Sequence, residues 1–130
     1  MKVNESTKYA ILTVGYIAQN QNKGLVLGPS ISKHYSIAQE YLTKLMQDLV
    51  KANILRSKRG PGGGFSLAKS LSKITLLDII EAIEGPMTES ISLEEYGQGD
   101  KFLSKATKAY DKVIAQARGA FRKIRMSKVV

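Results

Sequence analysis

The sequence predicts a mainly helical α+β fold with one small β-hairpin, and three features carry this prediction. A glycine-dense segment, residues 56–67, reads as a cationic strand, a tight turn and a second strand. Upstream of it, apolar residues recur at helical spacing over residues 38–52, and downstream a longer apolar seam covers residues 100–125. Short helices, a basic hairpin and a long final helix are the plan of a winged helix-turn-helix domain with a helical arm.

Three helices are expected before the hairpin. The first is capped by Ser6 and covers residues 6–20, and the second covers residues 28–34, with Pro29 near its start. The third covers residues 38–52, where the apolar stripe is Leu42, Leu45, Met46 and Leu49. Its start is uncertain by about two residues, because Ser36 with Gln39 also fits a capping box.

The hairpin itself combines positive charge with unusual backbone freedom. Arg56, Lys58 and Arg59 place three cations on it, and its loop holds four glycines and one proline. Such a loop can enter the narrow, electronegative minor groove of DNA. A phosphate-cradling nucleotide loop would end in Gly-Lys-Ser/Thr and lead into a helix, whereas residues 65–68 read as strand. A plain solvated hairpin is the other alternative.

Two segments follow the hairpin before the final helix. Thr75 and Asp78 can cap a helix over residues 76–84, which Gly85 and Pro86 end. Residues 86–99 show little periodicity and predict an acidic linker that can serve as a sensory loop. The predicted units are therefore a winged helix-turn-helix domain (1–85), this linker (86–99) and a dimerisation helix with a basic tail (100–130).

The final helix is expected to run from Asp100 to about Arg125. One small domain has little surface to cover a seam of this length, so the seam predicts a homodimer. Packing of the helix back on its own domain is the alternative. The dimerisation residues predicted from the spacing are Leu103, Ala106, Tyr110, Val113, Ala117, Phe121 and Ile124.

The charge of the chain is strongly positive and unevenly distributed. The 130 residues carry a formal charge of +9. Residues 1–76 hold 11 basic and 3 acidic side chains, residues 77–100 hold 7 acidic and no basic ones, and residues 101–130 hold 9 basic and 1 acidic. A basic N-terminal block favours a polyanionic partner such as double-stranded DNA, although solvated surface lysines give the same pattern.

Several classes of site and location are disfavoured by the composition. The chain contains no cysteine and one histidine, His34, so thiolate metal sites, disulfides and thiol chemistry are excluded. Glu81 and Glu84 fall on an amphipathic helix, where a solvated face explains them better than acid–base catalysis. We expect neither an enzyme nor a cofactor or metal site. Without a long apolar run or a leader-like start, we expect a cytoplasmic location and no membrane contact.

Several strings of the chain resemble one known family. They are residues 6–10 (STKYA), Tyr41-Leu42 with Leu45, residues 54–57 (ILRS), residues 59–65 (RGPGGGF) and residues 74–86 (ITLLDIIEAIEGP). In these the chain is similar to the Rrf-two superfamily of bacterial winged helix-turn-helix transcription regulators, which includes the iron–sulfur cluster regulator, the nitrite-sensitive repressor and the cysteine-metabolism repressor. The resemblance covers most of the chain.

The resemblance implies a homodimeric repressor on a near-palindromic operator, with the third helix in the major groove and the wing in the flanking minor groove. It places base-reading positions at Ala38, Glu40, Tyr41 and Thr43. It also implies a response to an effector protein or small molecule. Together with the cations of the hairpin and neighbouring helices, the expected DNA-binding set is Lys33, Ala38, Gln39, Glu40, Tyr41, Thr43, Lys44, Arg56, Lys58, Arg59, Gly60, Pro61 and Gly62.

The chain departs from the cluster-binding members of that family. Their three cysteine ligands match Ser92, Gln98 and Ser104 here, the position that some relatives fill with histidine is Thr107, and an aspartate ligand of one branch matches Lys8. We therefore expect a regulator without an iron–sulfur cluster. A winged protein-interaction module and a nonspecific nucleic-acid-binding protein remain the alternatives.

Overall fold

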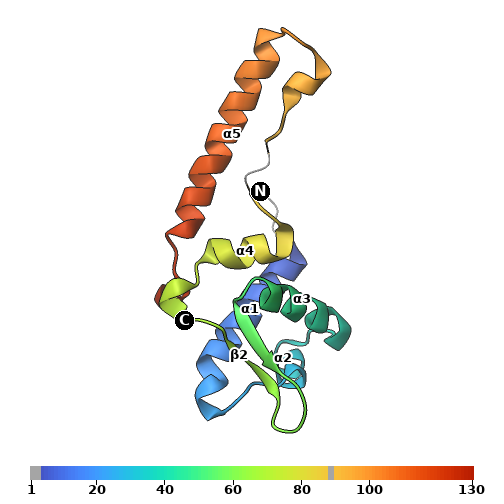
Figure 1. The fold of residues 1–130 in the computed structure, drawn as a ribbon, viewed down its shortest axis with the longest axis vertical. Coiled ribbons are helices and arrows are strands. Elements are labelled where there is room, and N and C mark those ends of the chain that lie inside the picture. Colours follow the sequence, from blue (N-terminus) through green and yellow to red (C-terminus); the bar gives the residue numbers. More distant parts are fainter. Residues whose placement is uncertain (1–3, 88–89) are drawn as a thin grey trace.

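The computed structural model describes residues 4–87 and 90–130, and within them the chain is mainly helical with a two-stranded antiparallel sheet (Figure 1). This confirms the predicted fold class. Residues 88 and 89 of the predicted acidic linker, and residues 1–3, lie outside the described residues. The helices and strands are α1 (Glu5–Asn20), α2 (Gly28–Tyr35), α3 (Gln39–Lys51), β1 (Leu55–Lys58), β2 (Gly64–Leu67), α4 (Leu76–Glu84) and α5 (Lys101–Arg122). Short 3₁₀ helices cover Gln21–Lys23 (η1), Leu71–Lys73 (η2), Leu93–Tyr96 (η3) and Met126–Lys128 (η4).

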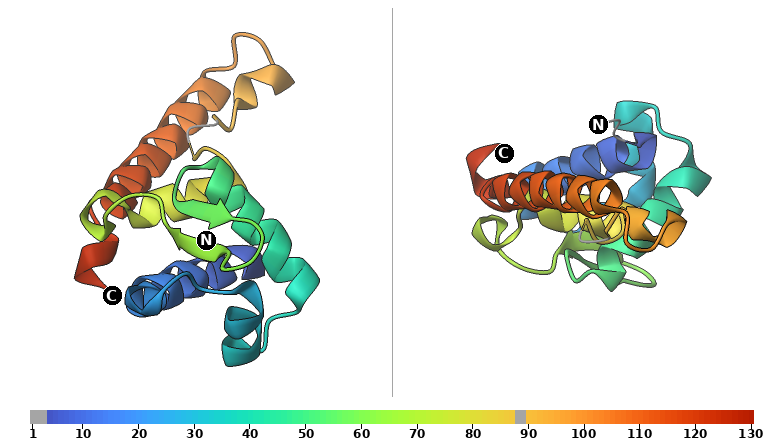
Figure 2. Two further views of the ribbon diagram at one scale, coloured as in Figure 1. Left: turned by 60° about the horizontal axis from the view of Figure 1, so that its bottom comes forward. Right: turned by 90° about the horizontal axis from the view of Figure 1, so that it is seen from above.

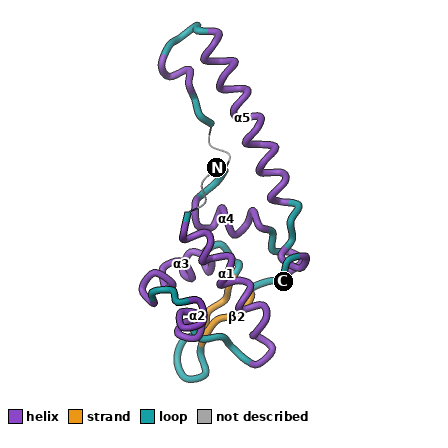
Figure 3. The backbone as a smooth tube through the Cα atoms, turned by 180° about the vertical axis from the view of Figure 1, so that it is seen from behind, coloured by secondary structure: helices purple, strands orange, loops and turns teal. Residues whose placement is uncertain are grey.

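We call residues 4–87 the body and α5 with the loop before it the arm. The body holds an apolar core between α1, α3, α4 and the hairpin, as the helical stripes predict. The arm rises away from it, and Figure 2 shows α4 lying between α5 and the remainder of the body. The strands lie in the body, toward the end opposite the tip of the arm (Figure 3). The fully buried side chains of the core include Val14, Ile17, Ile31, Leu42, Leu49, Ile54, Ile74 and Ile79.

Two helix starts differ from the sequence prediction. Asn4, not Ser6, precedes α1, and the Ser6 hydroxyl is instead paired with the hydroxyl of Tyr41 on α3. The Ser36 capping box does not form, because Ser36 adopts the left-handed conformation that ends α2 (φ 57°). Helix α3 therefore starts after Ala38, without a side-chain cap. Three residues, 36–38, separate α2 from α3, and the last of them, Ala38, has no side-chain acceptor that could cap the helix.

The start of α4 agrees with the prediction. The Asp78 amide donates to the Thr75 hydroxyl at 3.1 Å, and the Thr75 amide donates to the Asp78 carboxylate at 2.9 Å. This reciprocal box satisfies two amides that the first turn of a helix leaves without partners. Gly85 then ends the helix with a positive φ of 85°.

The C-terminal helix ends earlier than predicted, and the chain returns to the body. Helix α5 begins after its predicted cap, Asp100, but ends at Arg122 instead of Arg125. Backbone hydrogen bonds then join Ile124 to Leu76 and Met126 to Ile74, each at 2.8 Å, and the Met126 side chain is 1% exposed within the core. Burying this one apolar side chain draws residues 123–126 out of the helix. Ile124 thus lies beyond the helical seam in which the sequence placed it.

Candidate nucleic-acid interface

Helix α3 presents a continuous polar face to solvent. Its buried residues are the predicted stripe, and the opposite face is exposed over Gln39, Glu40, Thr43, Lys44, Gln47 and Lys51. The Thr43 hydroxyl donates to the Gln39 carbonyl at 2.9 Å, and the residue is exposed, so it offers a hydroxyl and a methyl group on this face. The face offers a carboxylate, amides, a hydroxyl and ammonium groups, which are the groups that distinguish base edges.

Tyr41 differs from the other predicted reading residues because it is fastened to α1. Its hydroxyl pairs with that of Ser6, and its ring meets Tyr9 edge to face, with centroids 5.5 Å apart. Its ring remains 42% exposed. These contacts fix the first turn of α3 against α1, so that the angle of the polar face is set by the body.

Helix α2 precedes α3 in the chain and carries a predicted DNA-binding lysine and the single histidine. Lys33 and His34 are both exposed. The His34 ring lies against Tyr16 and Tyr35, with centroids 5.0 and 4.7 Å away. An aromatic surface explains this histidine without any metal or catalytic role.

The hairpin folds as a wing with its cations exposed. Its strands pair from Leu55 with Leu67 to Lys58 with Gly64. The tight loop is closed by a hydrogen bond from the Gly63 amide to the Gly60 carbonyl at 2.9 Å. A Cβ on Gly63 would lie 2.3 Å from the Lys58 carbonyl oxygen, so only glycine fits there. The loop is therefore narrow, with Lys58 and Arg59 exposed beside it.

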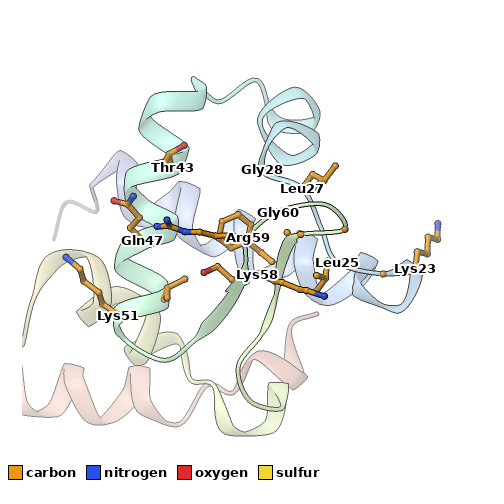
Figure 4. Close-up of a pocket in the computed structure, with 17 residues that line it drawn as sticks. Lys23, Leu25, Leu27, Gly28, Thr43, Gln47, Lys51, Lys58, Arg59 and Gly60 are labelled. Carbon is orange, nitrogen blue, oxygen red and sulfur yellow. The ribbon is translucent and has the colours of Figure 1, made fainter.

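A pocket of about 960 Å³ lies between α3 and the wing (Figure 4). Arg59 extends from the wing toward Gln47 of α3, and Thr43 lies on the same face of that helix (Figure 4). The third wall is the segment before α2, including Lys23, Leu25 and Leu27, which sequence reasoning did not include. The helical spacing of Thr43, Gln47 and Lys51 was the available signal for the α3 wall.

The apolar seam of α5 is only partly covered by the rest of the chain. Phe102, Val113 and Tyr110 are 70%, 60% and 47% exposed, whereas Leu103, Ala106, Ala117 and Phe121 are half-buried. Contacts of α5 are made with α4 and with η3. The predicted dimerisation residues thus lie along one helix, except Ile124, and two of them on that helix, Tyr110 and Val113, are exposed.

The loop before α5 is fastened to the helix by hydrogen bonds. The Leu93 amide donates to the Thr107 hydroxyl at 3.0 Å, and that hydroxyl donates to Glu94 at 3.1 Å. Asp111 accepts from the Ser90 hydroxyl at 2.6 Å and from the Ile91 amide at 3.2 Å. The segment predicted as an acidic linker is therefore docked on α5 over its described residues 90–99.

These residues do not fit an iron–sulfur cluster. The matching positions provide two serines, an amide and a threonine where iron requires thiolates, and the buried Thr107 hydroxyl is already engaged with Leu93 and Glu94. Within residues 4–87 and 90–130, no group of three histidine or acidic side chains is arranged to hold a metal. Nor does any helix of that described portion have the length and apolarity needed to cross a membrane.

Helices α4 and α5 are joined by a two-point ion pair. Arg118 donates to both carboxylate oxygens of Glu81, each at 3.2 Å, and the Met87 amide also donates to this carboxylate at 2.8 Å. Burial raises the pKa of Glu81. The hydrogen bonds from Arg118 and Met87 lower it, and together they outweigh burial, so that the pKa lies below its ordinary value of 4.5. Glu81 is therefore a structural carboxylate and not the solvated residue that the sequence predicted.

Comparison with known proteins agrees with this architecture. The family model Rrf2, described as "Iron-dependent Transcriptional regulator", matches residues 3–128. An HTH-type transcriptional regulator of Aquifex aeolicus is 41% identical over 81 residues, which are 62% of this chain and 56% of that protein. The chain spans about half to two thirds of the length of the curated relatives it matches.

Two solved structures have the same fold. CymR, the global cysteine regulator of B. subtilis, superposes with a TM-score of 0.80 at 21% identity, over 99% of this chain and 95% of that one. IscR of T. potens gives a TM-score of 0.78 at 26% identity, over 99% and 85%. The relatives are regulators and not enzymes, and the wing, α3 and the arm all fall within the matched residues. The chain therefore belongs to the Rrf2 family of transcriptional regulators.

Proposed function

We propose that the chain acts as a homodimeric, sequence-specific DNA-binding repressor that works without an iron–sulfur cluster. One observation carries the proposal: the polar face of α3 and the basic wing border one pocket. The exposure of Tyr110 and Val113 in the seam of α5 supports it further. The first arrangement suits reading of adjacent grooves, and the second suits pairing with another copy.

In this proposal two copies associate along α5 and present two α3 helices to one face of a duplex. Their spacing would match one helical turn, roughly 34–36 Å, which implies a near-palindromic operator. Glu40 accepts from a cytosine amino group and Thr43 contacts a thymine methyl, whereas Lys33 and Lys44 bind phosphates. Such a dimer represses by occupying promoter DNA that polymerase needs.

The effector is proposed to act at the loop before α5. This loop lies at the tip of the arm, remote from the wing (Figure 1). Its hydrogen bonds to Thr107 and Asp111 connect it to the same helix that carries the seam. An effector protein or small molecule that alters this docking can therefore change how two copies pair, and hence the spacing of their reading helices.

Footprinting on the promoter region of the protein's own gene tests the proposal, with a scrambled duplex as competitor. We expect a protected near-palindrome that the scrambled duplex does not remove. Uniform weak protection would instead indicate nonspecific binding, and the absence of protection would indicate a protein-interaction module.

Point variants test the assigned interface. Arg59→Ala should weaken operator binding by about 1–3 kcal/mol, the range for a specific base contact, whereas Lys112→Ala on the arm should have little effect. Thr43 and Glu40 variants should change the preferred base at single operator positions. Unchanged operator binding after substitution of Arg59, Thr43 and Glu40 would contradict the assigned interface.

A further inference from the structure

The pocket between α3 and the wing has a third wall that the proposed function does not use. Residues 23–27 form this wall. The Val26 amide donates to the Phe65 carbonyl at 2.9 Å, and the Phe65 amide donates to the Val26 carbonyl at 2.7 Å. Leu25 and Leu27, on either side of Val26, line the pocket and are 38% and 53% exposed (Figure 4). The wall therefore presents two leucines that are held in place by backbone pairing and not by burial.

The cations around the pocket differ in direction. Lys23 and Lys51 lie at opposite edges of the pocket and point away from each other (Figure 4). Arg59 instead extends across the pocket, from the wing toward Gln47 of α3 (Figure 4). Lys58 also lines the pocket, and the described lining residues include no aspartate or glutamate. The Arg59 guanidinium thus borders a partly apolar pocket in which no lining residue supplies a carboxylate.

A guanidinium beside apolar surface is suited to an organic carboxylate. The guanidinium presents parallel N–H donors that match a carboxylate, and such charge-assisted hydrogen bonds are stronger than neutral ones. The two leucines, with the half-buried Val50 and Phe65, supply apolar surface for a carbon skeleton. The volume of about 960 Å³ falls within the range of small-molecule pockets, roughly 300–1,000 Å³. An inorganic anion would use the cations but leave the leucines uncovered.

We propose that this pocket binds a small amphipathic carboxylate, with its acid group on Arg59 and its apolar body on Leu25 and Leu27. The occupant covers Thr43 and Gln47 on the polar face of α3, holds Arg59 back from DNA and adds negative charge where phosphates would approach. The ligand is therefore an antagonist of DNA binding, at a site separate from the loop before α5. The antagonism rests on the proposed function, whereas the binding of the ligand does not.

Binding of decanoate to the full chain without DNA tests the acid group, and isothermal titration calorimetry measures it. We expect one site per chain, and decyltrimethylammonium, which has the same tail and the opposite charge, should not bind there. Arg59→Gln should weaken decanoate binding about tenfold or more, the size of a lost charge-assisted hydrogen bond. Arg56→Gln removes the same charge from an exposed position of the same hairpin outside the pocket lining, and should keep the affinity. Equal affinities of the unmodified protein and Arg59→Gln would overturn the site.

The apolar half of the site has its own variant. Leu25→Ala/Leu27→Ala should weaken decanoate binding several-fold, because it removes apolar contacts only. Val113→Ala, in the exposed seam of α5, is the matched control and should keep the affinity. In a ¹⁵N spectrum, the Arg59 Nε–H resonance should shift on titration with decanoate while the amides of α5 do not. Shifts confined to α5 would place decanoate on the arm and overturn the site.

Competition with operator DNA tests the antagonism. Decanoate at about ten times its own dissociation constant should raise the apparent dissociation constant of a fluorescent operator duplex about elevenfold, because a competing ligand acts by mass action. Fluorescence anisotropy measures this change. The same decanoate concentration should have a smaller effect on Leu25→Ala/Leu27→Ala.

The outcomes separate this proposal from the proposed function. Specific operator binding without decanoate binding at Arg59 would overturn the ligand site alone. Simultaneous binding of decanoate and operator, with neither weakening the other, would overturn the antagonism. A protein without specific binding to duplex DNA would overturn the proposed function and the antagonism, and the calorimetry would still decide the ligand site.

Discussion

The body and the arm are stabilised by different interactions, and the difference indicates which part of the chain can respond to a signal. The body buries a contiguous set of apolar side chains from helices α1 to α4 and the hairpin. Among the described residues, Thr107 is the only one of α5 that is buried. In the arm, hydrogen bonds to Thr107 and Asp111 hold the loop on α5, and an ion pair between Arg118 and Glu81 joins α5 to the body.

Apolar burial is worth more than exposed or half-exposed polar contacts, so the body should unfold as a unit while the arm adjusts. The arm also leaves Phe102 and Val113 mostly exposed. Exposed apolar side chains of this kind are favourable only if another surface covers them. We infer that the body sets the geometry of DNA reading and that the arm is the adjustable part.

The largest expected effect is on the core of the body. Leu42→Ala truncates a fully buried side chain of α3 and should lower the free energy of unfolding by about 2–5 kcal/mol. Val113→Ala, on the exposed seam, should change the unfolding of the body by less than about 0.5 kcal/mol. Urea unfolding followed by helix circular dichroism at low protein concentration measures both. Equal losses would contradict the division into body and arm.

A charge in the seam should act on association and not on folding. In the proposed dimer, Val113→Asp places a carboxylate on each of two facing helices, and we expect the dissociation constant to rise about ten- to a hundredfold, or about 1.4–2.8 kcal/mol. Analytical ultracentrifugation measures this constant. Lys112→Asp, next to the seam but outside it, is the control, and dimers unaffected by Val113→Asp would place the interface elsewhere.

Local patterns were more predictable from sequence than contacts between distant segments, for a physical reason. Helical stripes such as that of α3, and the capping pair of Thr75 with Asp78, are local patterns that the core then satisfies. The burial of Met126 and the pairing of Val26 with Phe65 depend on residues distant in sequence, which no local periodicity reveals. The local pattern likewise predicted Ser6 as a helix cap, but its hydroxyl pairs with that of Tyr41 on another helix.

The same limit applied to the candidate interface. The polar face of α3 and the cations of the wing could be predicted, because each lies within one local element. Segment 23–27 could not, since its place beside the wing results from tertiary backbone pairing. The docking of the loop on Thr107 was equally hidden, because residues 90–99 have no periodicity of their own.

The joint between body and arm should make a smaller, pH-dependent contribution. The pKa of Glu81 is lowered in the folded chain, so its contribution to stability is complete above its unfolded pKa near 4.5 and is lost as the pH falls through the lower folded value. Glu81→Gln should cost about 1 kcal/mol at neutral pH, allowing for its partial exposure, and should reduce the loss of stability as the pH falls below the unfolded pKa near 4.5. Urea unfolding at a series of pH values measures this.

A double-mutant cycle assigns the effect to its partner. Arg118→Met should remove most of the pH dependence by itself, and Glu81→Gln/Arg118→Met should cost less than the sum of the single changes. Additive losses would show that Glu81 acts through the Met87 amide alone.

The smallest expected effect concerns the loop on the arm. Thr107→Val keeps the shape of a buried side chain but removes the acceptor of the Leu93 amide and the donor to Glu94. Losing one net hydrogen bond of about 1 kcal/mol should speed hydrogen exchange at the Leu93 amide about fivefold, while amides of α1 and α3 keep their protection. Thr107→Ser retains the hydroxyl and is the matched control. If exchange at Leu93 also rose in Thr107→Ser, packing of the methyl group would be holding the loop, and the polar attachment of the arm would have to be abandoned.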